Sequence, residues 1–159
     1  MTSTEWINQR FEVALTDDDI ANVKDFVLYW NVFEHTVCKK NFSIWKVEKI
    51  FKKKRFDETN FQFSIKYFRN RYVTNGKLND TFFLLKFREE EKHWQNFVEQ
   101  VLLEKQNCKN NIILASMIII YRFRNNLFHG EKEMTAIDTQ KENFETANRF
   151  LQTILNYFP

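Results

Sequence analysis

The chain has 159 residues, of which 43% are hydrophobic, and a formal net charge of +3. This length suits a single domain, which we expect to span residues 1–159 and to bury one apolar core. The sequence holds only two glycines, and its single proline is residue 159. A many-stranded sheet normally requires more turn residues than this. The composition therefore predicts an all-α fold, and the small net charge neither demands nor excludes nucleic acid as a partner.

The cysteines and the apolar segments exclude several classes of protein. Cys38 and Cys108 lie far apart and form no Cys-x2-Cys pair, so we expect neither a zinc site nor a disulfide framework, and no cofactor. The first nine residues lack the basic and apolar parts of a secretory signal. The most apolar run, residues 112–120, is about half the ~20 residues that a membrane-spanning helix needs. We therefore expect a cytoplasmic protein with no membrane segment.

Apolar periodicity predicts three helices in the first half of the chain. Residues 17–40 carry apolar side chains at three- and four-residue spacing, behind an acidic cluster, Asp17 to Asp19, that can cap the first turn. Residues 43–54 are apolar on one side and rich in lysine on the other, and a less regular pattern covers residues 58–73. Asn75-Gly76 then predicts a turn.

The second half predicts a further long helix and a pair of terminal helices. Residues 81–105 are amphipathic, with an exposed charged face expected over residues 88–92. After a polar connector, an apolar helix is predicted over residues 110–129, and Gly130 can adopt the left-handed conformation that ends it. A capping box beginning at Thr139 predicts the last helix. We expect an up-and-down bundle of about five to six helices, with the last two packed as a hairpin.

The end of the apolar helix brings together residue types that RNA cleavage without a metal ion requires. Arg124 is a permanent cation that suits phosphate oxygens, and His129 can act as general base or acid near neutral pH. Asn125 can orient the histidine or the phosphate, and it shares a helix face with His129, whereas Arg124 and His129 lie about 140° apart on an ideal helix. Alternatively, the arginine and the histidine only satisfy terminal carbonyls and complement the helix dipole.

The segment Arg124-Asn125-Asn126-Leu127-Phe128-His129, with its apolar lead-in and following glycine, resembles the Arg-polar-x3-His motif of the HEPN superfamily. That family consists of small all-helical domains, many of them RNases of toxin–antitoxin and antiphage systems. The resemblance implies a metal-independent endoribonuclease that leaves 2′,3′-cyclic phosphate ends, and a homodimer whose two motifs line one cleft. An antitoxin or another regulatory protein is a further candidate partner. Where related toxins carry a modifiable tyrosine, this chain has Glu131, so silencing by that route is not expected.

A basic segment between residues 39 and 55 contains Glu48 as its one acidic residue and is the candidate surface for steering RNA. The expected RNA-binding residues are Lys46, Lys49, Lys52, Lys53, Lys54, Arg55 and, on the apolar helix, Arg122. A solvated helix face would explain the same charges. Four aromatic side chains lie among these lysines and could stack bases, although their helical spacing favours a place in the core: Phe42, Trp45, Phe51 and Phe56.

Glu34 is the expected supporting residue, because a partly buried carboxylate needs a partner such as Arg122 or Arg124. His35 and His93 are expected to be exposed or at the edge of a helix. The sequence thus predicts a HEPN-like endoribonuclease. The alternatives are a non-catalytic HEPN-like module that binds RNA, a nucleotide or a protein, and a helical scaffold in which the arginine and the histidine are only caps.

Overall fold

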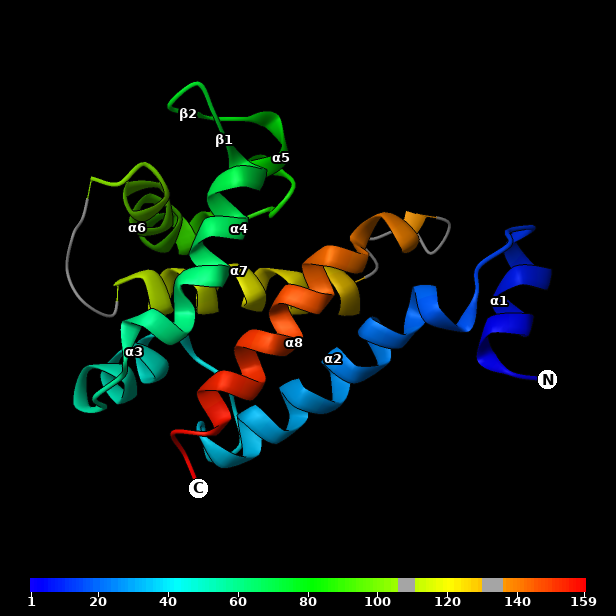
Figure 1. Ribbon diagram of the computed structural model, residues 1–159, viewed down its shortest axis with the longest axis horizontal. Helices are drawn as coiled ribbons and strands as arrows, with labels where there is room; N and C mark the ends of the chain where they lie inside the picture. The colour runs from blue at the N-terminus through cyan, green and yellow to red at the C-terminus, as the bar shows by residue number, and fades with distance from the viewer. Residues whose placement is uncertain (106–110, 130–135) are drawn as a thin grey trace.

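The computed structural model describes residues 1–105, 111–129 and 136–159, and it is mostly helical (Figure 1). The prediction of an all-α fold is confirmed. The strands in these ranges are β1 (Val73–Thr74) and β2 (Lys77–Leu78), which pair antiparallel. Asn75 and Gly76 between them both have positive φ, 51° and 72°. This is the backbone of a two-residue hairpin turn, and it is why an Asn-Gly pair stands there.

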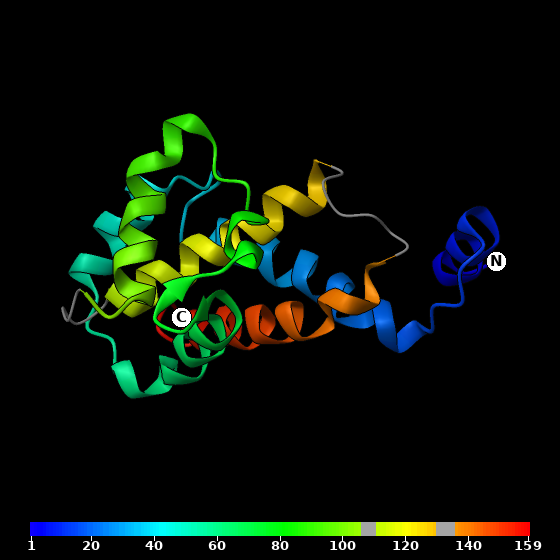
Figure 2. The ribbon, with the colours of Figure 1, turned by 90° about the horizontal axis from the view of Figure 1, so that it is seen from above.

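The N-terminal part differs from the prediction in one element. Helix α1 (Ser3–Phe11) was not predicted, and it stands apart from the other helices (Figure 2). Helix α2 (Asp17–Thr36) begins after Thr16, whose hydroxyl accepts from the Asp19 backbone while the Asp19 carboxylate accepts from the Thr16 backbone. The cap is therefore Thr16, and the acidic cluster occupies the first turn, where it complements the helix dipole.

The next two predicted helices are present. They are α3 (Ile44–Lys53) and α4 (Gln62–Tyr72), the latter preceded by the short 3₁₀ helix η1 (Glu58–Phe61). Both lie where the periodicity placed them, because each carries a stripe of side chains that the core buries.

The predicted long helix over residues 81–105 is wrong. The chain instead forms α5 (Asp80–Phe83), a loop in which Lys86 has a φ of +51°, the 3₁₀ helix η2 (Glu89–Glu91) and α6 (Lys92–Leu102). The expected exposed face over residues 88–92 is also wrong in part, because Glu91 is buried.

Helix α7 (Asn111–Phe128) runs through the centre of the molecule, and residues 112–120 are all buried, as their apolar character predicted. No helix among the described residues is long and apolar enough to cross a bilayer. The chain resumes with the 3₁₀ helix η4 (Asp138–Gln140) and α8 (Lys141–Leu155). The predicted capping box is wrong, since Thr139 lies inside η4 and its hydroxyl donates to the Ala136 carbonyl. Gly130, Glu131, Cys108 and the connector 106–110 lie outside the described residues.

Helix α8 packs most extensively against α2, and the two helices run parallel (Figure 1). The Asn148 amide donates to the Asn22 carbonyl at 2.9 Å, and one turn on, the Gln152 amide donates to the Tyr29 hydroxyl at 2.6 Å. The predicted hairpin of the last two helices is therefore not the main packing of α8, and this pair departs from an up-and-down arrangement.

Candidate active site at the end of the central helix

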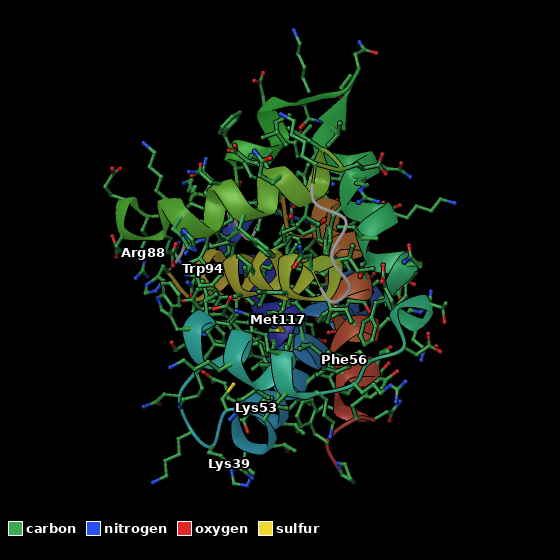
Figure 3. All side chains as sticks on the ribbon, turned by 90° about the vertical axis from the view of Figure 1, so that its left-hand side faces the viewer. Lys39, Lys53, Phe56, Arg88, Trp94 and Met117 are labelled. Carbon is green, nitrogen blue, oxygen red and sulfur yellow. The ribbon has the colours of Figure 1, made fainter. Side chains whose placement is uncertain are left out.

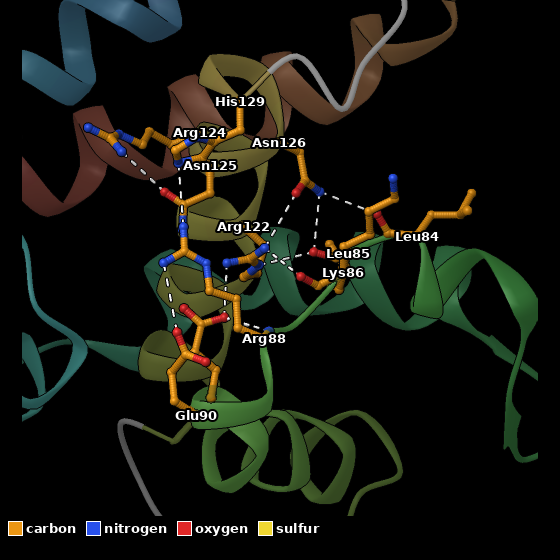
Figure 4. Close-up of polar contacts among 11 residues, drawn as sticks. Leu84, Leu85, Lys86, Arg88, Glu90, Arg122, Arg124, Asn125, Asn126 and His129 are labelled. Atoms are coloured by element: carbon orange, nitrogen blue, oxygen red, sulfur yellow. Dashed lines mark hydrogen bonds and ion pairs between the residues drawn. The ribbon is translucent and has the colours of Figure 1, made fainter.

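The last two turns of α7 and the residue after it place three predicted site residues at one end of the buried helix (Figure 4). The His129 backbone N–H donates to the Asn125 carbonyl at 2.9 Å, so helical bonding continues through the histidine. Asn125 is 2% exposed, Arg124 is half-buried and His129 is exposed. The helix therefore leaves the core at this point and carries its polar end to the surface.

Arg124 and Asn125 form one half of the site. The Arg124 Nη1 donates to the Asn125 Oδ1 at 3.2 Å, and the guanidinium lies 5.1 Å from the centre of the Phe128 ring. Two buried donors next to this bond, Arg124 Nε and Asn125 Nδ2, have no acceptor among the described residues. Buried donors without acceptors are costly and uncommon in proteins. Both atoms are covered by protein, so a phosphate oxygen could pair with them only after the end of α7 shifts.

Arg88 and His129 form the other half. The Arg88 Nη2 lies 3.4 Å from the His129 Nε2. A guanidinium can only donate, so a hydrogen bond here needs the His129 Nε2 as its acceptor. The contact joins the loop that carries Arg88 to the end of α7.

Sequence reasoning missed Arg88, because it lies 41 residues before His129 in the chain. It was placed on an exposed helix face, whereas it precedes η2 and its backbone N–H donates to the Glu91 carboxylate at 3.0 Å. The only local signal was the position of an arginine before three glutamates, which resembles a helix start. Its approach to the histidine follows from the loop after α5.

Comparisons with protein-family models, with curated proteins and with solved structures give no match. The chemistry of this site is therefore judged from its groups. It holds two cations, Arg88 and Arg124, an amide with a free donor and one histidine that can exchange a proton. The described residues include no group of three or more His, Cys, Asp or Glu side chains that could hold a metal ion. Arg124 and His129 make no hydrogen bond with each other, so the two halves would have to meet through a ligand.

Arg122 has a structural role, which corrects its assignment to RNA binding. Its side chain is 4% exposed and pairs with Glu91, itself 10% exposed, at 2.9 Å. Its other guanidinium nitrogens donate to the carbonyls of Leu85 at 3.0 Å and of Lys86 at 2.5 Å. Asn126 donates to the Leu85 carbonyl as well. Arg122 and Asn126 therefore fix the loop between α5 and η2 against α7, and that loop carries Arg88.

The supporting role predicted for Glu34 is also corrected. Its carboxylate accepts a hydrogen bond from the Phe42 backbone at 3.2 Å and so holds the turn after α2. The acidic partner of Arg122 is Glu91, and the contacts of Arg124 are with Asn125 and Phe128. The carboxylate that pairs with Arg122 therefore belongs to a residue nearer in the sequence than Glu34, because the loop before α6 folds back over α7.

The predicted basic surface is present on α3 and just after it. Lys49, Lys53 and Arg55 are exposed. The other three residues have local partners: Lys52 pairs with Glu48, Lys46 donates to backbone carbonyls after α2, and Lys54 lies 4.5 Å from the centre of the Phe158 ring. In Figure 3, Lys53 lies on α3, and Arg88 and Trp94 lie together beside the start of α6. A cationic surface thus exists, although half of its members also serve local structure.

The core role of the aromatic residues is confirmed for three of the four. Phe51 is buried, Phe42 stacks on Tyr121 at 4.3 Å between ring centres, and Phe56 packs on Tyr157. Trp45 differs, because it is 57% exposed. Periodicity could not separate these residues, since all four lie near the apolar stripe of α3.

Cys38 is not a candidate nucleophile. It is fully buried, and burial, with a further contribution from nearby Glu34, raises the pKa of its thiol to about 11. The reactive form of cysteine is the thiolate, which such a group does not form near neutral pH.

Proposed function

We propose that this protein is a HEPN-like endoribonuclease that cuts RNA through attack of the ribose 2′-hydroxyl on the adjacent phosphate, leaving a 2′,3′-cyclic phosphate. The observation that carries the proposal is the polar end of α7. There, Arg124, Asn125 with its unused amide donor and His129 lie within two turns, and Arg88 contacts the histidine. The motif resemblance and the helical fold support the same family. The proposed biological role is that of a toxin or an antiphage effector.

The reaction assigns one task to each group. His129 takes the proton of the 2′-hydroxyl, and Arg124 and Arg88 stabilise the charge that develops on the phosphate. A phosphate oxygen is a better acceptor for Arg88 than a neutral imidazole, because a charged acceptor makes the stronger bond. When the substrate binds, Arg88 would exchange its contact with the His129 Nε2 for a bond to a phosphate oxygen, and that nitrogen would then be free to act as a base. Once the end of α7 shifts, Asn125 donates its unused amide N–H to the phosphate.

The leaving 5′-oxygen needs a proton, and one histidine in each site favours a second copy of the chain as its source. We therefore propose a homodimer with the active cleft at its interface. Large apolar side chains stand exposed close to the site: Phe83 and Leu84 at 57% and Phe128 at 54%. The Leu84 carbonyl accepts from Asn126, which ties this patch to the last turns of α7. Exposed apolar patches of this kind are typical of protein interfaces.

The test is incubation of the purified protein with mixed RNA in excess EDTA, followed by analysis of the new ends. We expect cyclic phosphate ends from the wild type and none from His129→Ala or Arg124→Ala. The matched control is His35→Ala, an exposed histidine near the end of α2, which should cut like the wild type. Cleavage that persists in His129→Ala would refute the assignment of the site, and cleavage lost in EDTA would refute the metal-independent mechanism.

A second candidate is a non-catalytic module that binds RNA. It is favoured by the exposed cations of α3, Lys49, Lys53 and Arg55, which need no active histidine. If no RNA is cut by a confirmed dimer, this candidate predicts salt-sensitive RNA binding that falls in a Lys49→Ala/Lys53→Ala variant. His129→Ala would then leave the affinity unchanged.

A further inference from the structure

An exposed tryptophan on α3 is held in a fixed orientation by two other rings. Trp45 lies parallel to His93, with 5.6 Å between ring centres and 8° between planes, and it forms a T-shaped pair with Trp94, with 4.8 Å between ring centres. Trp94 is buried and anchors this group to the core, whereas Trp45 is 57% exposed and His93 is exposed. The indole therefore has the imidazole stacked against one side and keeps an accessible surface.

Cationic residues neighbour both rings along the chain. Lys49 is four residues after Trp45 on α3, so the two share a helix face, and it is exposed. Lys92 is exposed beside His93 in the first turn of α6. Arg88, which contacts His129, is five residues before His93. The ring pair thus lies where the basic surface of α3 meets the segment that reaches the proposed active site.

We propose that Trp45, supported by His93, stacks a base of the single-stranded RNA whose backbone passes the flanking cations. This inference rests on the proposed function, since it takes RNA as the substrate. Proteins that bind single strands combine such cations with aromatic faces, and stacking tolerates any base because every base has a π-face. A ring held by two others loses little conformational freedom on binding, which favours its use as a platform. His93 acts as a positioning residue in this arrangement.

Another tryptophan of the chain provides a matched control. Trp6 on α1 is 53% exposed, close to the value for Trp45, but it makes no ring contact among the described residues. If exposed indole alone bound RNA, the two positions would behave alike. The proposal requires that only Trp45 contributes.

The test measures affinity for an unstructured RNA oligonucleotide in the His129→Ala background, so that cleavage does not interfere. We expect Trp45→Ala to bind roughly tenfold more weakly, as the loss of one stacked base predicts, and Trp6→Ala to bind unchanged. Trp45→Phe keeps an aromatic ring against Trp94 and should lose only part of the affinity. Circular dichroism confirms folding, and the affinity of Trp45→Phe decides the question if Trp45→Ala is unfolded. An oligonucleotide with abasic positions offers no base to stack, so it should bind proteins with and without Trp45→Ala with the same affinity.

The outcomes separate this inference from the proposed function. Equal affinity of the Trp45 and Trp6 variants would overturn the stacking platform, while cleavage by the wild type would still support the nuclease. RNA bound but never cut would refute the nuclease, and the Trp45 comparison would still decide the platform. A lower oligomeric mass in Trp45→Ala, with RNA affinity unchanged, would identify the ring pair as a subunit contact and overturn the proposal.

Discussion

Two arginines on α7, two residues apart, are expected to respond to substitution in opposite ways. Arg122→Met substitutes an unbranched apolar side chain for the arginine, so it removes the partner of Glu91 and the donors to the Leu85 and Lys86 carbonyls. Because the pair is almost fully buried, its loss leaves an uncompensated carboxylate, and breaking such a pair costs about 3–5 kcal/mol. This is a large part of the ~5–15 kcal/mol that holds a typical domain folded.

Arg124→Met should instead have a small effect on stability. It removes one hydrogen bond to Asn125 at 3.2 Å, worth about 1 kcal/mol, and it also removes a buried Nε that has no acceptor among the described residues. Cleavage of RNA should be lost all the same, since the cation that faces the phosphate is gone.

The assay is urea denaturation followed by tryptophan fluorescence, with RNA cleavage measured on the same preparations. Glu91→Gln provides the second arm, because in its background no buried charge is left when Arg122 is replaced. The further cost of Arg122→Met should then fall well below its cost in the wild type. A loss of less than about 1 kcal/mol for Arg122→Met in the wild type would refute the structural role of the pair. Retained cleavage in Arg124→Met would refute the role of Arg124.

Three further predictions concern stability and reactivity. Hydrogen bonds from Thr16 hold the pKa of Asp19 below its usual 3.8, so the Asp19 carboxylate stabilises the fold above pH 3.8 and this contribution is lost as the pH falls through the lowered pKa. Asp19→Asn should therefore lower the urea midpoint at pH 7, and the difference from the wild type should shrink as the pH falls below 3.8. The pKa of Cys38 is raised from 9.0 to about 11, so stability should fall as the pH rises through that interval, and in a Cys108→Ser variant the thiol should resist a thiol reagent at pH 8 until urea unfolds the chain. Phe26→Ala should cost about 3–5 kcal/mol in urea denaturation, because this fully buried ring joins α2 to α8.

The sequence by itself determined the features that depend on neighbours within a turn or two. The all-α fold, the helices around residues 17–36, 44–53, 62–72 and 111–128, and the Asn-Gly turn were all predicted, because apolar spacing and turn residues act locally. The exposed basic residues of α3 and the position of Asn125 and His129 on one turn came from the same helical geometry.

The tertiary structure decided which distant residues meet. The guanidinium of Arg122 donates to the carbonyls of Leu85 and Lys86, which follow α5 in a segment where a continuous helix was predicted. The chain bends at Lys86 and brings Arg88 to His129. The carboxylate that pairs with Arg122 belongs to Glu91 and not to Glu34. Helix α8 packs parallel to α2. The two partners in each of these contacts are 31 or more residues apart in the sequence. Which residues meet therefore depends on how the buried surfaces fit together, and this cannot be predicted from apolar periodicity along the chain.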